Sequence, residues 1–199
     1  MAQQVLLPSR LIVILAVLFF GCHREQSDGK RTISSVLLNK NGADLTMDNG
    51  LVFSGGKPFT GRLYILFQGT KDTAEISSYL DGREHGKWEK FFQGHKRKEL
   101  RYFKNGQKTG LYQAWWENGK RQLEYSFSED EYEGTCREWN EKGELSRIMN
   151  YRKGYEEGPQ KWWYDGGKMK ANYIIKDGRR YGLLGTKNCI NVSDSIFKN

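Results

Sequence analysis

The chain has 199 residues, enough for one domain with appendages, and its 32 lysines and arginines against 24 acidic residues give a formal net charge of +8. Glycine is frequent at 23 residues, proline is rare at 3, and aromatic residues make up 14% of the chain. This composition excludes a disordered or collagen-like chain and favours a β protein with many tight turns. The three cysteines are too few for a disulfide-stabilised scaffold.

The first segment, residues 1–21, is expected to be a signal peptide. Arg10 precedes an apolar run over residues 11–20, which is as long as a signal-peptide core but much shorter than the roughly 20 residues that a membrane span requires. The run ends at Gly21-Cys22, an order that resembles a bacterial lipoprotein signal. The resemblance implies lipidation of Cys22 and attachment to a membrane of the cell envelope. An ordinary secretory signal with a chance cysteine is the alternative.

The rest of the chain divides into three expected parts. Residues 22–50 are polar and form a tether with the first strand or strands, of which residues 33–38 supply the apolar side chains. Residues 51–187 form a repeat domain, and residues 188–199 form a C-terminal tail.

Residues of the same kind recur every 24 positions through this repeat domain. Glycine recurs at Gly86, Gly110, Gly134, Gly158 and Gly182. One apolar row contains Phe91, Trp115, Trp139 and Trp163, and a second contains Tyr79, Phe103, Phe127, Tyr151 and Ile175. Such internal periodicity indicates a repeat architecture in which each unit packs on its neighbours.

Each unit contains two short aromatic-rich runs separated by a turn, such as Asn118-Gly119. Asp81-Gly82 and Asn105-Gly106 turn the chain between units. Asn-Gly and Asp-Gly pairs favour the type I′ turn, in which both central residues have positive φ. The sequence therefore predicts an all-β fold, an elongated antiparallel meander of tandem β-hairpin repeats with about twelve strands.

The segments over residues 79–88 and 103–112 resemble the MORN repeat in its bacterial variant, which is typical of the YwqK-type antitoxin family. The resemblance covers about residues 51–187. It implies a sheet of consecutive hairpins, a binding role and no catalytic residues. Asp130 stands where the pattern has glycine, and Gln160 stands where it has an aromatic residue.

The row from Phe91 to Trp163 is expected to share one face of the sheet, because side chains alternate along a strand. A stacked ladder that forms the core is the first interpretation of this row, and an aromatic binding stripe is the alternative. The repeated glycines, from Gly86 onward, are expected to leave space for the ring of the adjacent hairpin.

Candidate binding residues lie on the face whose side chains vary between units. The expected aromatic patch consists of Trp88, Phe92, Tyr112 and Trp116, with burial under the termini as the alternative. Basic residues follow the hairpin turns, above all Lys96, Arg97 and Lys98. Lys96, Lys120 and Lys168 share one position of the repeat, and Glu144 interrupts that row. A basic edge can attract an anionic partner or can simply be a solvated edge.

No catalytic motif, metal site or cofactor site is predicted from the sequence. Cys136 and Cys189 are expected either to pair or, for Cys136, to pack as a free thiol. The expected function is that of a non-enzymatic, envelope-anchored scaffold for an unidentified protein partner. An antitoxin-like protein that binds a toxin is the alternative, and membrane or glycan binding through the basic edge is a weaker one. Nucleic acid is a poor candidate for an exported protein.

Overall fold

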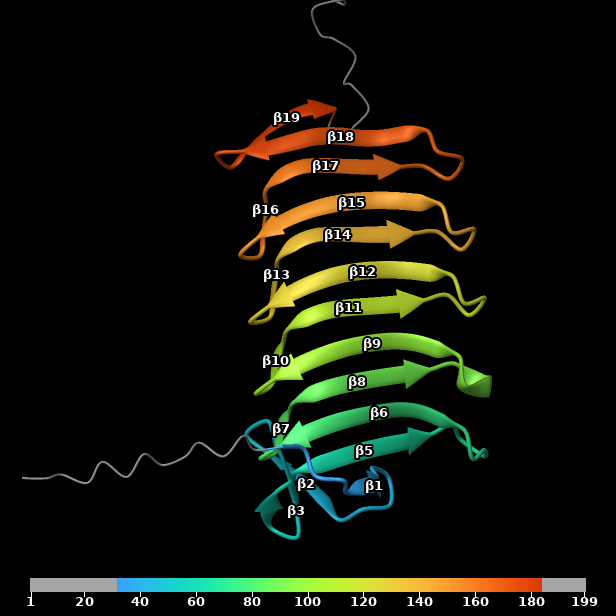
Figure 1. Ribbon diagram of the computed structural model, residues 1–199, viewed down its shortest axis with the longest axis vertical. Helices are drawn as coiled ribbons and strands as arrows, with labels where there is room; N and C mark the ends of the chain where they lie inside the picture. Colours follow the sequence, from blue (N-terminus) through green and yellow to red (C-terminus); the bar gives the residue numbers. More distant parts are fainter. Residues whose placement is uncertain (1–31, 184–199) are drawn as a thin grey trace, which may run out of the picture. The chain divides into compact units, whose positions relative to one another are not determined.

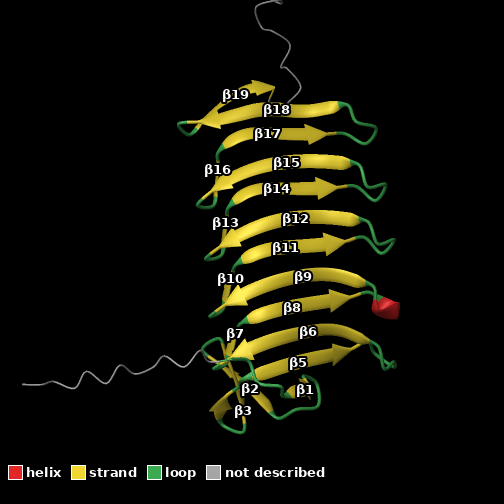
Figure 2. Cartoon of the chain, in the orientation of Figure 1, coloured by secondary structure: helices red, strands yellow, loops and turns green. Residues whose placement is uncertain are grey.

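The structure, a computed structural model, describes residues 32–183, which form one long sheet and one small sheet. The long sheet has 16 strands, and twelve of them follow one another in chain order along the path β1-β5-β6-β8-β9-β11-β12-β14-β15-β17-β18-β19 (Figure 1). All neighbours on this path except β1 and β5 are antiparallel (Figure 2). The predicted antiparallel meander of β-hairpin repeats is confirmed.

The long strands come in pairs, one hairpin for each repeat. The pairs are β5 (Gly61–Leu66) with β6 (Thr73–Leu80), β8 (Gly86–Phe91) with β9 (Arg97–Lys104), β11 (Gly110–Trp115) with β12 (Arg121–Ser128), β14 (Gly134–Trp139) with β15 (Leu145–Arg152), and β17 (Gly158–Trp163) with β18 (Met169–Lys176). β19 (Arg179–Leu183) ends the path. A single 3₁₀ turn, η1 (Gln93–His95), lies between β8 and β9.

Short strands connect one hairpin to the next. They lie at the edge of the sheet opposite the loops within the hairpins, and we call this edge the turn edge. They are β7 (Arg83–Glu84), β10 (Gln107–Lys108), β13 (Glu131–Tyr132) and β16 (Tyr155–Glu156). Both central residues of each connecting turn have positive φ, for example 53° at Asn105 and 86° at Gly106, so the predicted type I′ turns are found here. Asp130, in the glycine position, has a φ of 69°, and its Oδ1 accepts a hydrogen bond from the Lys108 amide at 2.9 Å. This hydrogen bond stabilises aspartate in a turn position where the other repeats have glycine.

The loops within the hairpins, at what we call the loop edge, follow a different rule. In the loop from Trp116 to Lys120 only Gly119 has positive φ, at 85°, so the type I′ turn expected at Asn118-Gly119 is wrong. The Trp116 amide donates to the Lys120 carbonyl at 2.9 Å, and the Lys120 amide donates to Asn118 Oδ1 at 3.0 Å. A β-bulge follows the loop and leaves Gln122 as the extra residue of β12.

The spacing suggested that the repeated glycines leave space for a neighbouring ring, and for three of the five this is wrong. At Gly86 an added Cβ would lie 2.7 Å from Ile33 Cδ1, and at Gly182 it would lie 2.6 Å from the Asn172 carbonyl oxygen, so neither meets a ring. A Cβ added at Gly110, Gly134 or Gly158 would meet nothing within 4 Å. These glycines have φ values of 66° to 76°, at the bend where each short strand passes into the next long strand. The repeat therefore requires glycine for its backbone conformation, which other residues adopt only at a cost.

The two faces of the long sheet differ in burial. We call the face that carries Tyr79, Phe103, Phe127, Tyr151 and Ile175 the core face, and the opposite one the outer face. Every buried residue between β9 and β18 lies on the core face: Phe103, Ala114, Cys136, Met149, Gln160, Ala171, Tyr173 and Ile175. The row from Phe91 to Trp163 shares the outer face and is only partly buried, so its assignment as the core ladder is wrong.

Ring contacts stabilise the core face across repeats. Tyr132 of β13 lies 4.7 Å from Phe127 of the preceding hairpin and 5.0 Å from Tyr151 of the next, between ring centroids. Such pairs contribute about 0.5–1.5 kcal/mol beyond the area they bury. Gln160, which replaces an aromatic residue, is fully buried. Its side-chain amide is hydrogen-bonded to the Asn150 backbone, since Nε2 donates to the carbonyl at 2.8 Å and Oε1 accepts from the backbone amide at 3.1 Å.

The N-terminal end of the described chain is covered by additional strands. β1 (Leu37–Asn39) pairs with β5 in parallel. β2 (Leu45–Asp48), β3 (Leu51–Ser54) and β4 (Lys57–Pro58) form a separate three-stranded sheet, so the first residues of the expected repeat domain lie outside the long sheet. A cluster of Val52, Phe59, Leu63 and Tyr79 forms the apolar core at this end.

Candidate functional site

The aromatic patch expected from the sequence is divided between two places. Trp88 and Tyr112 lie on the core face, with ring centroids 5.1 Å from Phe103 and 5.9 Å from Tyr125 respectively. Phe92 and Trp116 lie at the loop edge instead, where the first strand of each hairpin ends. The first two residues therefore pack the core, and only the second two remain candidates for binding.

The three consecutive basic residues that follow η1, Lys96, Arg97 and Lys98, also point to different places. Arg97 lies on the outer face, where its Nη2 is 3.1 Å from Glu89 Oε1. Lys98 lies over the Phe92 ring, with Nζ 5.4 Å from the ring centroid. Lys96 Nζ donates to the Glu117 carbonyl at 3.5 Å.

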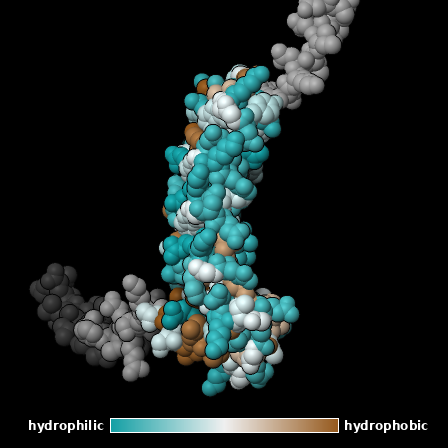
Figure 3. Space-filling model, turned by 90° about the vertical axis from the view of Figure 1, so that its right-hand side faces the viewer, coloured by the Kyte–Doolittle hydropathy of each residue, from teal (hydrophilic) through white to brown (hydrophobic). Residues whose placement is uncertain are grey.

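The lysines that share one position of the repeat connect neighbouring loops. Lys120 Nζ donates to the Lys142 carbonyl at 2.7 Å, in the same way as Lys96 donates to the next loop. Glu144, which interrupts the basic row, accepts from the side chain of Asn140 at 2.9 Å. Figure 3, which views the molecule from the loop edge, shows a mainly hydrophilic surface there. These bonds give the basic row a role in holding consecutive loops together.

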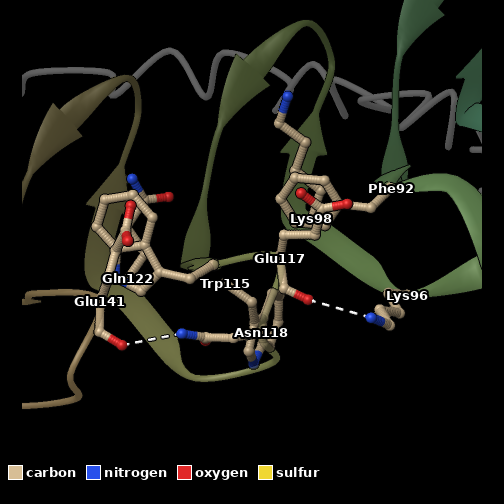
Figure 4. A pocket seen from close by; sticks show the side chains of 9 residues that line it. Phe92, Lys96, Lys98, Trp115, Glu117, Asn118, Gln122 and Glu141 are labelled. Atoms are coloured by element: carbon tan, nitrogen blue, oxygen red, sulfur yellow. Dashed lines mark hydrogen bonds between the residues drawn. The ribbon is translucent and has the colours of Figure 1, made fainter.

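A cavity of about 660 Å³ opens between the loops at this edge. We call it the loop cavity, and Figure 4 shows its lining: Phe92, Lys96, Lys98, Trp115, Trp116, Glu117, Asn118, Gln122 and Glu141. Four of the residues proposed from the sequence, Phe92, Trp116, Lys96 and Lys98, meet here. Glu117, Gln122 and Glu141 were not proposed as site residues from the sequence, and Gln122 is placed here by the bulge in β12.

The partly buried outer-face row forms a second candidate surface, which we call the aromatic stripe: Phe91, Trp115, Trp139 and Trp163. The Trp115 ring lies between two guanidinium groups, at 5.7 Å from Arg97 and 4.8 Å from Arg121. Within the described chain, the four rings make no contact with one another. The stripe therefore offers tryptophan and arginine side chains that the core does not require.

A smaller cavity of about 220 Å³ lies over the core face and is lined in part by Tyr112, Phe127 and Tyr132. The chain's own cations cover its rings. Arg101 lies 4.3 Å from the Tyr112 centroid, and Lys108 lies 5.5 Å from the Phe127 centroid. Tyr112 and Phe127 also contact each other, with ring centroids 6.4 Å apart, so these rings belong to the packing of the core face.

Burial raises the pKa of several hydroxyl groups on the core face. The tyrosines concerned are Tyr79, Tyr112, Tyr125, Tyr132, Tyr151 and Tyr173. For Tyr151 the pKa rises to about 12. For Tyr125 burial is reinforced by the hydrogen bond that its hydroxyl donates to Glu138 Oε1. These hydroxyls therefore stay protonated at neutral pH.

The described cysteine and histidines lie in different parts of the sheet, Cys136 in β14, His85 before β8 and His95 at the end of η1. Burial also raises the pKa of the Cys136 thiol, which makes it a poor nucleophile. His85 bonds to Asn105, and His95 lies 3.7 Å from Asp72. Residues 32–183 contain no group of three or more side chains that could hold a metal ion. Cys22 and Cys189 lie outside the described residues, so neither the anchor nor the pairing of Cys189 with Cys136 is tested.

Among residues 32–183 no helix has the length and apolar character that a membrane crossing requires. No family model matches the sequence, and no curated protein matches it. The solved structures similar to the chain include the crystal structure of TarM, at 13% identity and a TM-score of 0.32, over 55% of this chain and 21% of that one. A variant of S. aureus TarM in complex with Fondaparinux, alpha-GlcNAc-glycerol and UDP gives 13% identity and a TM-score of 0.31, over 60% and 21%. The chain thus spans about a fifth of the length of these proteins, at similarities too low to indicate a function.

Proposed function

We propose that the chain is a non-enzymatic, envelope-anchored scaffold that binds a protein partner through the aromatic stripe. The observation that carries the proposal is the position of Trp115 on the outer face, between the guanidinium groups of Arg97 and Arg121. Tryptophan and arginine are the residues most enriched among those that dominate the binding energy of protein interfaces. Guanidinium stacking also holds the ring in one orientation before a partner arrives.

The repeat architecture supports an extended interface. Trp139 and Trp163 occupy the same position in the following hairpins, so the stripe continues from unit to unit along the sheet. Arg137, which lies 3.8 Å from Glu124, adds a further partly exposed cation to this face. Repeat proteins commonly bind partners over surfaces of this kind, which several units build together.

The non-enzymatic part of the proposal is supported by the buried Cys136 thiol, whose raised pKa makes it a poor nucleophile. The partner class suggested by the expected export signal is an envelope protein. The class suggested by the resemblance to the YwqK-type family is a toxin, which would then have to act in the envelope. Identification of the partner separates these two classes.

The test is recovery of a partner from envelope extracts with matched variants of the full chain. We choose Trp139→Ala as the stripe variant, because Trp139 does not line the loop cavity. Tyr155→Ala is the control, since Tyr155 is 80% exposed and lies in β16 at the turn edge. We expect one protein in stoichiometric amount with the wild-type chain and with Tyr155→Ala, and its loss with Trp139→Ala. Equal recovery with both variants, or no stoichiometric protein, contradicts the proposal.

Anchoring is tested separately by Cys22→Ser. The variant should move from the membrane fraction to the soluble fraction after cell lysis, because it lacks the thiol that carries the lipid. Radiolabelled fatty acid should mark the wild-type chain and leave the variant unlabelled. Membrane retention of an unlabelled Cys22→Ser chain equal to that of the wild type would refute the anchor.

A further inference from the structure

The loop cavity lies where the repeat departs from its regular geometry. The loop between β8 and β9 contains η1 and has two residues with positive φ, Gly94 at 74° and His95 at 58°. The next loop has a single residue of this kind, Gly119. The cavity lies at this pair of loops and extends to Glu141 of the loop between β14 and β15.

Aromatic rings form the apolar part of the cavity lining. Phe92 and Trp116 occupy the same position in successive hairpins, and Trp115 contributes from the end of β11. Trp116 Nε1 donates to the Trp139 carbonyl at 3.1 Å, which fixes the ring without a ligand. The cavity thus presents ring surfaces that are held in place by the fold.

Hydrogen-bond donors and acceptors both surround these rings. The Gln122 amide and the carboxylates of Glu117 and Glu141 make no hydrogen bond or ion pair with any described residue. Asn118 spans the loops, since its Nδ2 donates to the Glu141 carbonyl at 2.9 Å (Figure 4). Lys98 Nζ faces the Phe92 ring and has no carboxylate partner in the described chain. Donors and acceptors are therefore both available to a ligand.

The formal charges of the lining cancel, because two lysines, Lys96 and Lys98, stand against two glutamates, Glu117 and Glu141. A site for phosphate, sulfate or a carboxylate ligand would require an excess of cations. The balance instead suits a ligand without net charge that has many hydrogen-bonding groups.

We propose that the loop cavity is a binding site for an uncharged oligosaccharide. The C–H groups of a sugar ring carry partial positive charge and pack against the negative faces of Phe92 and Trp116. Each sugar hydroxyl both donates and accepts, so it can pair with the Gln122 amide and with the Glu117 carboxylate. A volume of about 660 Å³ falls in the range of small-ligand pockets and accommodates a short oligosaccharide.

This site is additional to the proposed protein-binding surface. The two surfaces share Trp115 alone, and Trp139 belongs to the stripe but not to the cavity lining. Loss of the protein partner in Trp139→Ala would therefore leave sugar binding intact, and failure of either proposal does not imply failure of the other.

Isothermal titration of the full chain with a defined panel tests the inference. Maltotriose, cellotriose and chitotriose are the uncharged probes, and a hyaluronan tetrasaccharide and mannose 6-phosphate are the anionic ones. We expect at least one uncharged probe to bind, and Trp116→Ala to weaken it by about tenfold or more. Tyr164→Ala is the matched control, since Tyr164 fills the same position of the repeat outside this cavity, and it should leave the affinity unchanged.

Gln122→Ala keeps the test valid even where Trp116→Ala disturbs folding, because the Gln122 side chain makes no hydrogen bond in the described chain. Its melting temperature should equal that of the wild type while its affinity falls by about three- to tenfold. Trp116→Phe should recover part of the affinity, since it restores a ring face. Absence of binding by every uncharged probe up to about 10 mM, tighter binding of an anionic probe, or unchanged affinity in Gln122→Ala would overturn the inference.

Discussion

The two faces of the long sheet carry aromatic side chains in every repeat but hold them in different ways. On the core face the rings contact one another, as Tyr132 contacts Phe127 and Tyr151. Core-face rings also contact cations, as Tyr112 contacts Arg101, whereas the described outer-face rings contact cations alone, as Trp115 contacts Arg97 and Arg121. The core face includes buried side chains such as Cys136 and Ala171, whereas between β9 and β18 no described outer-face residue is buried.

The short strands account for this difference. β13 places Tyr132 against the core face, and β16 places Glu156 within 3.2 Å of the Tyr173 hydroxyl on the same face. These two connections therefore supply side chains to the core face. A sheet built from a single layer of strands can in this way bury side chains on one face more deeply than on the other.

The largest expected effect is alkaline unfolding, because six tyrosines with raised pKa all lie on the core face. In the unfolded chain a tyrosine ionises with a pKa of about 10, whereas Tyr151 in the folded chain does so at about 12. Between these values the unfolded state has lost protons that the folded state keeps, so stability is complete below pH 10 and falls as the pH rises. Urea unfolding from pH 8 to 12 measures this fall.

Tyr151→Phe should reduce the fall between pH 10 and 12, because the variant has one ionising group fewer. A free energy of unfolding that stays constant up to pH 12 would show that the core-face hydroxyls are not protected. It would also remove the distinction between the faces on which this expectation rests.

Phe103→Ala should have the next largest effect. The Phe103 side chain is 6% exposed and its ring lies 5.1 Å from Trp88, so its removal leaves a cavity in the core face. Loss of such a ring costs about 3–5 kcal/mol of unfolding free energy. Tyr102→Ala is the control from the neighbouring position of β9, since Tyr102 faces outward and is 38% exposed, and it should cost under about 1 kcal/mol. Similar losses for the two variants would mean that the faces are wrongly assigned.

Trp139→Ala compares the two faces directly. Trp139 and Phe103 each belong to a row that recurs every 24 residues, but the row of Trp139 lies on the outer face. Its ring is partly buried and makes no ring contact in the described chain, so we expect a loss of about 1–2 kcal/mol in urea unfolding. If Trp139→Ala lowers the free energy of unfolding as much as Phe103→Ala does, the row from Phe91 to Trp163 forms part of the core, as the sequence suggested.

The repeat was predictable from sequence, whereas the assignment of its faces was not. The 24-residue step predicted the hairpins, and Asn105-Gly106 predicted the turns between them. Alternation along a strand separates Phe91 from Trp88 but does not say which of them is covered. Which face is covered depends on where the short strands pack, and a strand of two residues is too short to show a periodic pattern in the sequence.

The candidate site was predictable in part for the same reason. Phe92 and Trp116 were proposed as part of an aromatic patch and Lys98 as a basic residue after a hairpin turn, and the three do meet at the loop cavity. Trp88 and Tyr112 have the same alternation as Phe92 and Trp116, yet they lie under core rings because they are further from the loop. Arg97 separates from Lys98 at the bulge, which propensity alone does not locate.

Gly110→Ala should have the smallest effect, and it tests why the glycine row repeats. Gly110 lies opposite Phe127 on the core face, with a φ of 66° and no atom within 4 Å of an added Cβ. Alanine there fits sterically but must adopt a left-handed conformation, which costs about 1 kcal/mol. Gly110→Asn should cost less, because asparagine tolerates this conformation better, as Asn105 does nearby with a φ of 53°. A greater loss with asparagine than with alanine in urea unfolding would mean that space rather than backbone conformation limits this position, and that the core face is closed more tightly at the bends than its ring contacts indicate.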